Sequence, residues 1–208
     1  MPIDELLSRI RRIYASIDVL QEFDMGKLPA KFFQNDHVVA MFQDFTGALS
    51  EEDLANVAHT VIHNIANLQD HLRRWAAHNG QDKTKVDTKF KTSQPLKVIQ
   101  DLSNNDKHGY PPRNNGYSGC APKLANLRRQ MRLTTKAEAG SRVVMILGPR
   151  GVPKVSGSGT ACAVITADVV DQDGNRIDDL FQIEQAAVAA WEALLVDYAI
   201  LANEHQST

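Results

Sequence analysis

The spacing of apolar residues between Leu54 and Trp75 constrains the fold most strongly. Apolar side chains recur there at alternating steps of four and three, at Leu54, Ala58, Val61, Ile65, Leu68, Leu72 and Trp75. This period places them on one face of a long α-helix, which must bury that face against other helices. Ser50 and the acids that follow it predict the start of the helix, and Asn79-Gly80 predicts its end.

Three more helices are predicted from the same kind of period. The first carries Ile3, Leu6, Ile10, Ile13, Ile17 and Leu20, and Gly26 and Pro29 close it. Another begins near Pro95, after a possible cap at Ser93, and runs to His108 on Leu96, Val98, Ile99 and Leu102. The last runs from about Asp179 to Asn203, with its apolar face at Leu180, Ile183, Ala187, Trp191, Leu194, Tyr198 and Leu201.

The stretch between the last two helices predicts β structure. Residues 142–148 and 160–170 are rich in β-branched residues, and residues 148–159, GPRGVPKVSGSG, are expected to form a hairpin loop between them. Asp171–Asn175 predicts a turn that returns the chain through Arg176. The pattern of residues 124–133 fits either a helix or a strand.

The remaining connections are expected to be irregular. Residues 31–49 suggest a short helix within an apolar connection, and the lysine-rich stretch 81–93 suggests a loop. Residues 110–123, YPPRNNGYSGCAPK, predict a long loop because proline and glycine interrupt regular structure. The fold class is therefore mainly α with a small β part. A bundle of about four helices carries an antiparallel sheet of two to four strands before the C-terminal helix, in one domain over residues 1–208 with a loop and β insertion at about 109–178.

Composition and charge place the chain among ordinary globular proteins. Hydrophobic residues make up 43% of the sequence and charged residues 23%, and the two cysteines do not suggest a disulfide framework. No apolar run has the length of a membrane span, and Asp4, Glu5 and Arg9 stand where a secretory signal would be apolar. We therefore expect a cytoplasmic protein without a membrane partner.

Basic and acidic residues are unevenly distributed. Residues 107–154 hold ten lysines and arginines against one acid, Glu138, whereas residues 155–208 hold nine acids and one base, Arg176. The basic segment could be a surface for a phosphate backbone, or the two segments could neutralise each other in the fold.

A polar cluster at the end of the third predicted helix is the strongest hint of chemistry. If the helix reaches His108, then Asp101, Asn105 and His108 lie about one turn apart on its polar side. A carboxylate, an amide and an imidazole would then be neighbours. The alternative is ordinary capping, in which Lys107 and His108 face the negative end of the helix dipole and Gly109 ends the helix.

The run Leu102–Tyr110, LSNNDKHGY, resembles a group of bacterial helical proteins with a DKH signature that look related to the HEPN superfamily. The resemblance implies a bundle of about four helices that is often a homodimer. Active members of that superfamily cleave RNA without a metal, using an arginine followed four to six residues later by a histidine, and toxin or phage-defence roles are known among them. Here the arginine is missing before His108, and that spacing occurs instead between Arg73 and His78.

Two hypotheses follow for the function. In the first, the chain binds RNA or nucleotide phosphate, either as a binding protein or as a metal-independent endoribonuclease. His108 would act as acid or base beside Asp101 and Asn105, and Lys107, Arg113, Arg73 or Arg74 would hold phosphate. In the second, it is a non-catalytic helical protein that dimerises or binds a partner. An open cleft with a basic group near His108 favours the first, and a buried His108 ring favours the second.

Other candidate sites also have simpler structural explanations. Tyr110 and Tyr117 could stack on a base, or they could cover the end of the helix. His59 and His63 form an i, i+4 pair that could bind a metal, but a solvated polar face is favoured, and no metal or other cofactor is predicted. The loop 148–159 lacks the ending of a phosphate loop, and Asp171–Asn175 lacks the spacing of a calcium loop.

Overall fold

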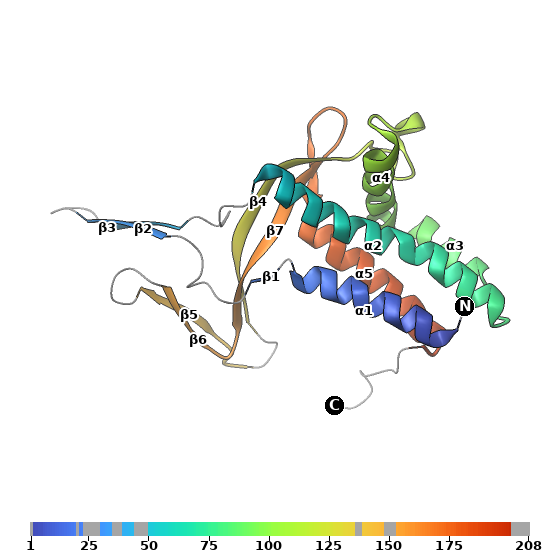
Figure 1. Cartoon of the computed structure of the whole chain (residues 1–208), viewed down its shortest axis with the longest axis horizontal. Helices are drawn as coiled ribbons and strands as arrows, with labels where there is room; N and C mark the ends of the chain where they lie inside the picture. Colours follow the sequence, from blue (N-terminus) through green and yellow to red (C-terminus); the bar gives the residue numbers. More distant parts are fainter. Residues whose placement is uncertain are drawn as a thin grey trace. The chain divides into compact units, whose positions relative to one another are not determined.

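The structure is a computed structural model that describes residues 2–19, 21–22, 30–34, 39–43, 50–135, 139–147 and 153–200 (Figure 1). The chain divides into two compact units, which we call the helical unit and the strand unit. The helical unit comprises Met1–Ser16, His59–Asn126 and Ala167–Thr208. The strand unit comprises Ile17–Ala58 and Leu127–Thr166. The insertion predicted at about 109–178 therefore contributes residues to both units.

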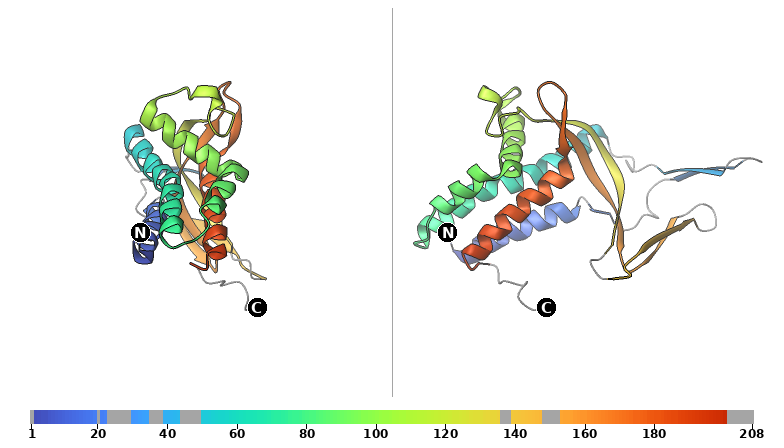
Figure 2. Two further views of the ribbon diagram at one scale, coloured as in Figure 1. Left: turned by 90° about the vertical axis from the view of Figure 1, so that its right-hand side faces the viewer. Right: turned by 180° about the vertical axis from the view of Figure 1, so that it is seen from behind.

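The helical unit contains α5 (Leu180–Asp197) and most of α1 (Ile3–Val19) and α2 (Glu51–His78), three long helices that lie side by side (Figures 1 and 2). Most residues of their predicted apolar faces are buried, but Ile3 at the start of α1 is 41% exposed, and Leu20 lies outside the described residues. Residues of all three helices line one small apolar space: Ile10 and Ile13 of α1, Ile65 and Leu68 of α2, and Trp191 and Leu195 of α5. α5 ends at Asp197, before the predicted end at Asn203, and residues 201–203 lie outside the described residues, as do Gly26 and Pro29.

The capping predicted at Ser50 is confirmed. The backbone amide of Asp53 donates to the Ser50 hydroxyl at 3.1 Å, and the Ser50 amide donates back to the Asp53 carboxylate at 3.2 Å. This reciprocal pair satisfies two amides that a helix start leaves without partners, and aspartate takes the place that glutamate or glutamine holds in the usual motif.

The loop predicted at residues 81–93 is wrong, because Thr84–Thr92 forms a helix, α3. Val86 and Phe90 stand four residues apart on it and are both buried. This single pair of apolar side chains gives α3 its inner face, and α3 packs against α4 and α5. The many lysines of the stretch remain on the outer side, which explains why composition suggested a loop.

Helix α4 (Gln94–His108) has the predicted length and the predicted buried face at Leu96, Val98, Ile99 and Leu102. Pro95 stands in its first turn, but the Ser93 side chain makes no capping hydrogen bond. At the other end, Gly109 adopts a positive φ of 85° and its amide donates to the Asn105 carbonyl at 2.9 Å. The chain thus leaves α4 abruptly and enters the loop that follows.

The main sheet is built around β7 (Thr160–Val170). It is hydrogen bonded to β1 (Gln21–Glu22), β4 (Lys123–Thr134) and β8 (Arg176–Asp179). β4 decides the open question of residues 124–133 in favour of a strand. The Asp171 carboxylate accepts hydrogen bonds from the amides of Asp173 and Asn175, which confirms the predicted turn between β7 and β8.

Two separate antiparallel hairpins correct the sequence predictions. β2 (Ala30–Gln34) pairs with β3 (Val39–Gln43), where a short helix was expected. β5 (Val143–Leu147) pairs with β6 (Pro153–Gly157), so part of the loop predicted at 148–159 is itself a strand. Short segments rich in aromatic and β-branched residues gain more from cross-strand pairing than from an isolated helix of a few residues.

The fold class is the predicted one: mainly α, with a small antiparallel sheet that precedes the C-terminal helix. Within the described residues there are five α-helices. None of these helices combines the length and the apolar character that crossing a bilayer requires.

Candidate functional site at the end of helix α4

A cavity of about 590 Å³ lies beside the C-terminal half of α4 and the loop that leaves it, entirely within the helical unit. The lining residues come from α4 and from residues 109–117, which include a short 3₁₀ turn, η2 (Arg113–Asn115): Asp101, Asn104, Asn105, His108, Gly109, Pro112, Arg113, Asn114, Gly116 and Tyr117. The three residues predicted to be neighbours on the polar side of the helix therefore do face one cavity. The predicted long loop supplies its other wall.

Asp101 holds that wall in place. Its side chain is 1% exposed, and its two oxygens accept hydrogen bonds from the amides of Tyr117 at 2.8 Å and Ser118 at 2.7 Å. Both oxygens thus have partners within the protein, and the carboxylate ties the loop to the helix. Asp101 is therefore a positioning residue in this structure, rather than an acid or base that is open to a ligand.

Two asparagines of α4, Asn104 and Asn105, line the cavity beside Asn114 of the loop. The Asn105 Nδ2 donates to the Pro122 carbonyl at 2.8 Å, whereas its buried Oδ1 has no hydrogen-bond partner among the described residues. Asn104, which the sequence analysis did not select, accepts a bond from Gln100 at 3.1 Å. Asn104 precedes His108 by four residues, so helical spacing alone would have included it.

His108 and Arg113 bring an imidazole and a guanidinium to the cavity. Both side chains are exposed, and neither makes a hydrogen bond or an ion pair with another described residue. The guanidinium carries a permanent positive charge, and both groups can donate hydrogen bonds. The two groups are therefore available to an anionic ligand.

The two loop tyrosines differ in their surroundings. Tyr110 donates a hydrogen bond to the Ala121 carbonyl at 3.3 Å, and the Lys123 ammonium lies 5.5 Å from its ring centroid. These contacts fit the covering role considered for it. Tyr117 lines the cavity and is 60% exposed, and its ring packs edge to face with that of Phe90 at 5.4 Å between centroids. The exposed part of the ring is available for stacking.

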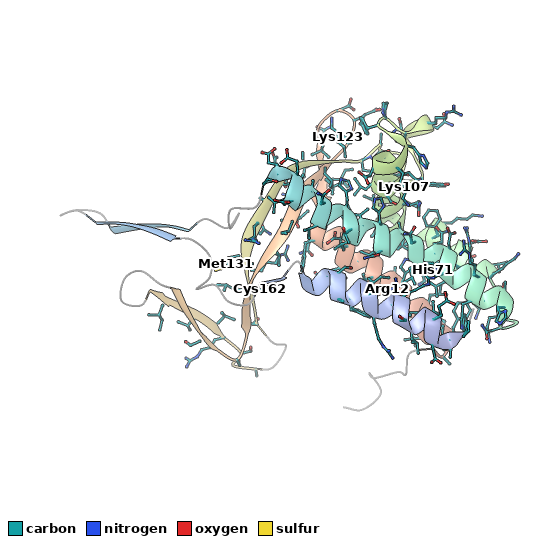
Figure 3. The ribbon with its side chains drawn as sticks, in the orientation of Figure 1. Arg12, His71, Lys107, Lys123, Met131 and Cys162 are labelled. Carbon is teal, nitrogen blue, oxygen red and sulfur yellow. The ribbon has the colours of Figure 1, made fainter. Side chains whose placement is uncertain are left out.

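Three of the predicted phosphate-binding residues do not line the cavity. Lys107 is exposed on α4 (Figure 3). Arg73 forms ion pairs with Asp87 of α3 at 2.5 Å and with Asp70 at 3.6 Å. Arg74 is exposed on α2. The arginine–histidine spacing of the superfamily is therefore found on α2, between Arg73 and His78. There the ion pair of Arg73 with Asp87 joins α2 to α3.

The histidine pair of α2 is not the solvated polar face that was favoured from the sequence. His59 and His63 are half-buried, and His63 bonds to Ser103 at 2.8 Å and to Asp106 at 2.7 Å, both on α4. Burial lowers the pKa of His59, and the hydrogen bond from His63 lowers that of Asp106. Sequence reasoning noticed the pair but could not see that α4 supplies its partners.

The fold and the cavity define a mainly α protein with a small antiparallel sheet and one polar, cationic hollow at a helix end. Comparison of the chain with protein-family models, with curated proteins and with solved structures gives no match. Chemically, the arrangement offers an arginine, an imidazole, the amide of Asn104 and an exposed aromatic ring on one cavity. This set suits an anionic ligand that also carries a flat ring.

Proposed function

We propose that the cavity beside α4 binds RNA through a phosphate and one base. The observation that carries the proposal is that His108 and Arg113 line the same cavity as the exposed ring of Tyr117. The volume of about 590 Å³ falls within the range of about 300–1,000 Å³ of small-molecule sites, which accommodates one nucleotide. A free nucleotide phosphate has the same chemistry and is the simplest ligand to test beside RNA.

The phosphate would lie against Arg113 and His108. The guanidinium can donate two parallel hydrogen bonds to a phosphate, and a protonated imidazole adds a third donor. The carboxyl end of α4 is the negative end of its dipole and disfavours an anion there. Binding therefore depends on these two side chains, and the removal of Arg113 should weaken it strongly.

The base would lie on Tyr117. Stacking on an aromatic face contributes about 1–3 kcal/mol per base and tolerates different sequences. Asn104 lines the same cavity, and its Nδ2 can donate a hydrogen bond to a base or to a ribose hydroxyl. A deoxyribose backbone lacks that hydroxyl, so the comparison of RNA with DNA tests this contact.

If the protein also cleaves RNA, His108 is the proton acceptor of the cavity. The 2′-oxygen would attack the adjacent phosphorus as His108 takes its proton, and the 5′-oxygen would leave and take a proton from water. The products are a 2′,3′-cyclic phosphate and a free 5′-hydroxyl. Arg113 would stabilise the charge that develops on the phosphorus oxygens. Asp101 has no direct part in this step, because both of its oxygens bond to backbone amides.

Binding is tested with a fluorescent mixed-sequence RNA oligomer, in EDTA and across a salt series. We expect Arg113→Ala and Tyr117→Ala each to reduce the affinity by about tenfold or more. Loss of one phosphate contact should also reduce the slope of the logarithm of the binding constant against the logarithm of the salt concentration by about 0.7 for single-stranded RNA. Arg12→Ala, an exposed arginine of α1 (Figure 3), is the matched control and should bind as the wild type does.

Cleavage is followed in the same samples by gel electrophoresis. A nuclease reaction that disappears in His108→Ala, while circular dichroism shows an intact fold, supports the catalytic form of the proposal. Binding without cleavage supports an RNA-binding module. Wild-type affinity in Arg113→Ala, or the absence of salt-sensitive binding, contradicts the proposal and leaves the non-catalytic, partner-binding alternative.

The cytoplasmic location and the homodimer remain part of the proposal. Light scattering coupled to size-exclusion chromatography gives the mass of the protein particle and therefore its number of chains. Titration of RNA into the same sample gives the number of protein chains bound per RNA molecule. Two chains per particle are expected, as the resemblance of residues 102–110 implies.

A further inference from the structure

A second group of polar side chains joins α2 to α4, apart from the cavity. His59 and His63 are one turn apart on α2, and Asp106 reaches them from α4. One ligand atom from each of the three lies within 4.8 Å of the other two. None of the three lines the cavity proposed for RNA.

His59 carries a nitrogen whose burial is not compensated. Its Nδ1 is buried and has no hydrogen-bond partner among the described residues, and it lies 3.8 Å from Oδ1 of Asp106. A buried polar atom without a partner is costly, so native structures usually satisfy it. A cation held between this nitrogen and the carboxylate would do so.

His63 is already oriented as a metal ligand would be. Its Nε2 faces Oδ2 of Asp106 at 2.7 Å, while its Nδ1 contacts the hydroxyl of Ser103, a fully buried residue, at 2.8 Å. Histidines that bind a metal commonly donate their other ring N–H to such a partner. Because a hydroxyl can both donate and accept, Ser103 can keep this contact when a metal replaces the proton between His63 and Asp106.

The cluster offers two imidazoles and one carboxylate, and neutral imidazole and carboxylate are the forms that coordinate a metal. Asp106 is the most exposed of the three side chains, so an ion and a water ligand have access from solvent.

We propose that Nδ1 of His59, Nε2 of His63 and the carboxylate of Asp106 bind a first-row divalent transition ion, Zn²⁺ foremost, with water as the fourth ligand. Two imidazoles and a carboxylate are a common donor set for zinc with an open position. Tetrahedral ligands about 2.0–2.1 Å from zinc lie roughly 3.4 Å apart. To reach that spacing, His63 Nε2 and Oδ2 of Asp106, now 2.7 Å apart, would move apart, and His59 Nδ1 and Oδ1 of Asp106, now 3.8 Å apart, would move together, by less than about 1 Å in each case.

This site changes the role of the histidine pair that the sequence suggested. Two histidines alone do not make a site, and no metal was predicted because no further ligand was evident. The third ligand stands 43 residues later than His63 on another helix. The site also ties α2 to α4, so a bound ion should raise the melting temperature of the helical unit.

The test uses the full chain without a histidine tag, stripped with EDTA and dialysed into metal-free buffer. Zn²⁺ is titrated calorimetrically, and Co²⁺ is titrated with its visible absorption as a direct report on tetrahedral coordination. We expect one ion per chain. His59→Ala, His63→Ala and Asp106→Asn should each weaken Zn²⁺ binding by at least tenfold, and Ser103→Ala by about tenfold.

His78→Ala is the matched control, because it removes an exposed histidine from the same helix and should leave the affinity unchanged. Circular dichroism confirms that each variant is folded, and Asp106→Asn keeps the size of the side chain. A wild type that shows no saturable binding at one ion per chain overturns the proposal, and so does full affinity in both Asp106→Asn and His63→Ala. His108→Ala should bind Zn²⁺ with wild-type affinity, because His108 is not a proposed metal ligand. The metal-site proposal and the RNA-binding proposal are therefore tested independently.

Discussion

The carboxylate of Asp101 lies directly against Gly116, in the space that a side chain at residue 116 would need. A Cβ atom added to Gly116 would be 2.5 Å from the carboxyl carbon and from both oxygens of Asp101. Gly116 also has a φ of 75°, which a residue with a Cβ rarely adopts. The wall of the cavity is therefore held by one buried acid and one glycine that makes room for it.

Gly116→Ala should release the loop from α4. We expect a loss of about 2 kcal/mol or more in the free energy of unfolding, from backbone strain and from displacement of the Asp101 carboxylate. Urea unfolding measures this loss. Gly119→Ala is the control, since Gly119 has a similar φ of 79° but no atom within 4 Å of an added Cβ. Equal losses in the two variants would show that the contact with Asp101 does not matter.

Asp101→Asn should destabilise the protein although the two side chains have the same shape. One oxygen becomes an NH₂ group, which would face the amide of Tyr117 or Ser118. Two opposed donors in a buried place should lower the free energy of unfolding by about 1–3 kcal/mol. Chemical denaturation tests this, with Asp173→Asn in the exposed β7–β8 turn as the control. Unchanged stability in Asp101→Asn would argue that the carboxylate does not hold the loop.

Glu184 should make stability depend on pH. This residue of α5 is 1% exposed, neither oxygen has a hydrogen-bond partner among the described residues, and burial together with Asp179 raises its pKa from 4.5 to about 8. In the unfolded chain the group loses its proton above about 4.5, whereas in the folded protein it keeps the proton up to about 8. Stability should therefore fall as pH rises between these values, by up to about 5 kcal/mol at about 1.4 kcal/mol per pH unit.

Glu184→Leu should remove most of this dependence. The variant should melt at a higher temperature than the wild type at pH 8, and the two should converge near pH 4.5. Thermal melts between pH 4 and pH 9 provide the comparison. Gln185→Leu, at an exposed position of the same helix, controls for the added leucine. Parallel melting curves for the wild type and Glu184→Leu across this range would contradict the assignment.

Ser50→Ala should weaken the start of α2. The Ser50 hydroxyl accepts the Asp53 amide and also donates to the Asp53 carboxylate at 3.0 Å. Loss of an N-terminal cap costs about 1 kcal/mol in the free energy of unfolding. Ser8→Ala, at an exposed position within α1, should change stability by a few tenths of a kcal/mol at most. A loss at Ser50 no larger than that at Ser8 would mean that the cap contributes nothing measurable.

Much of the architecture could be predicted because it depends on local patterns. The four-three spacing from Leu54 to Trp75 identified α2, and the glycine after His108 identified the end of α4. The prediction of a loop at residues 81–93 was wrong because it relied on the lysine-rich composition and not on the spacing of two apolar residues. In α3, lysines concealed one buried pair, Val86 and Phe90, and a helix that short obtains its stability from tertiary packing.

The candidate site was predicted only in part. Helical spacing correctly placed Asp101, Asn105 and His108 on one side of α4, and these residues line one cavity together with Arg113. Spacing could not separate their roles, because the bonds that occupy Asp101 come from amides 16 and 17 residues away. The arginines chosen on α2 were local candidates, and the ion pair of Arg73 with Asp87 depends on how α3 packs.

The sequence by itself determined where α1, α2, α4 and α5 form, because the period of their apolar residues follows from the geometry of a single helix. It also determined that polar groups gather at the end of α4. Tertiary structure alone decided which of these groups remain open to a ligand. It buried Asp101 under the loop, left His108 and Arg113 at the cavity, and brought Asp106 to His63 across two helices. Such contacts depend on packing between distant parts of the chain, which no local pattern records.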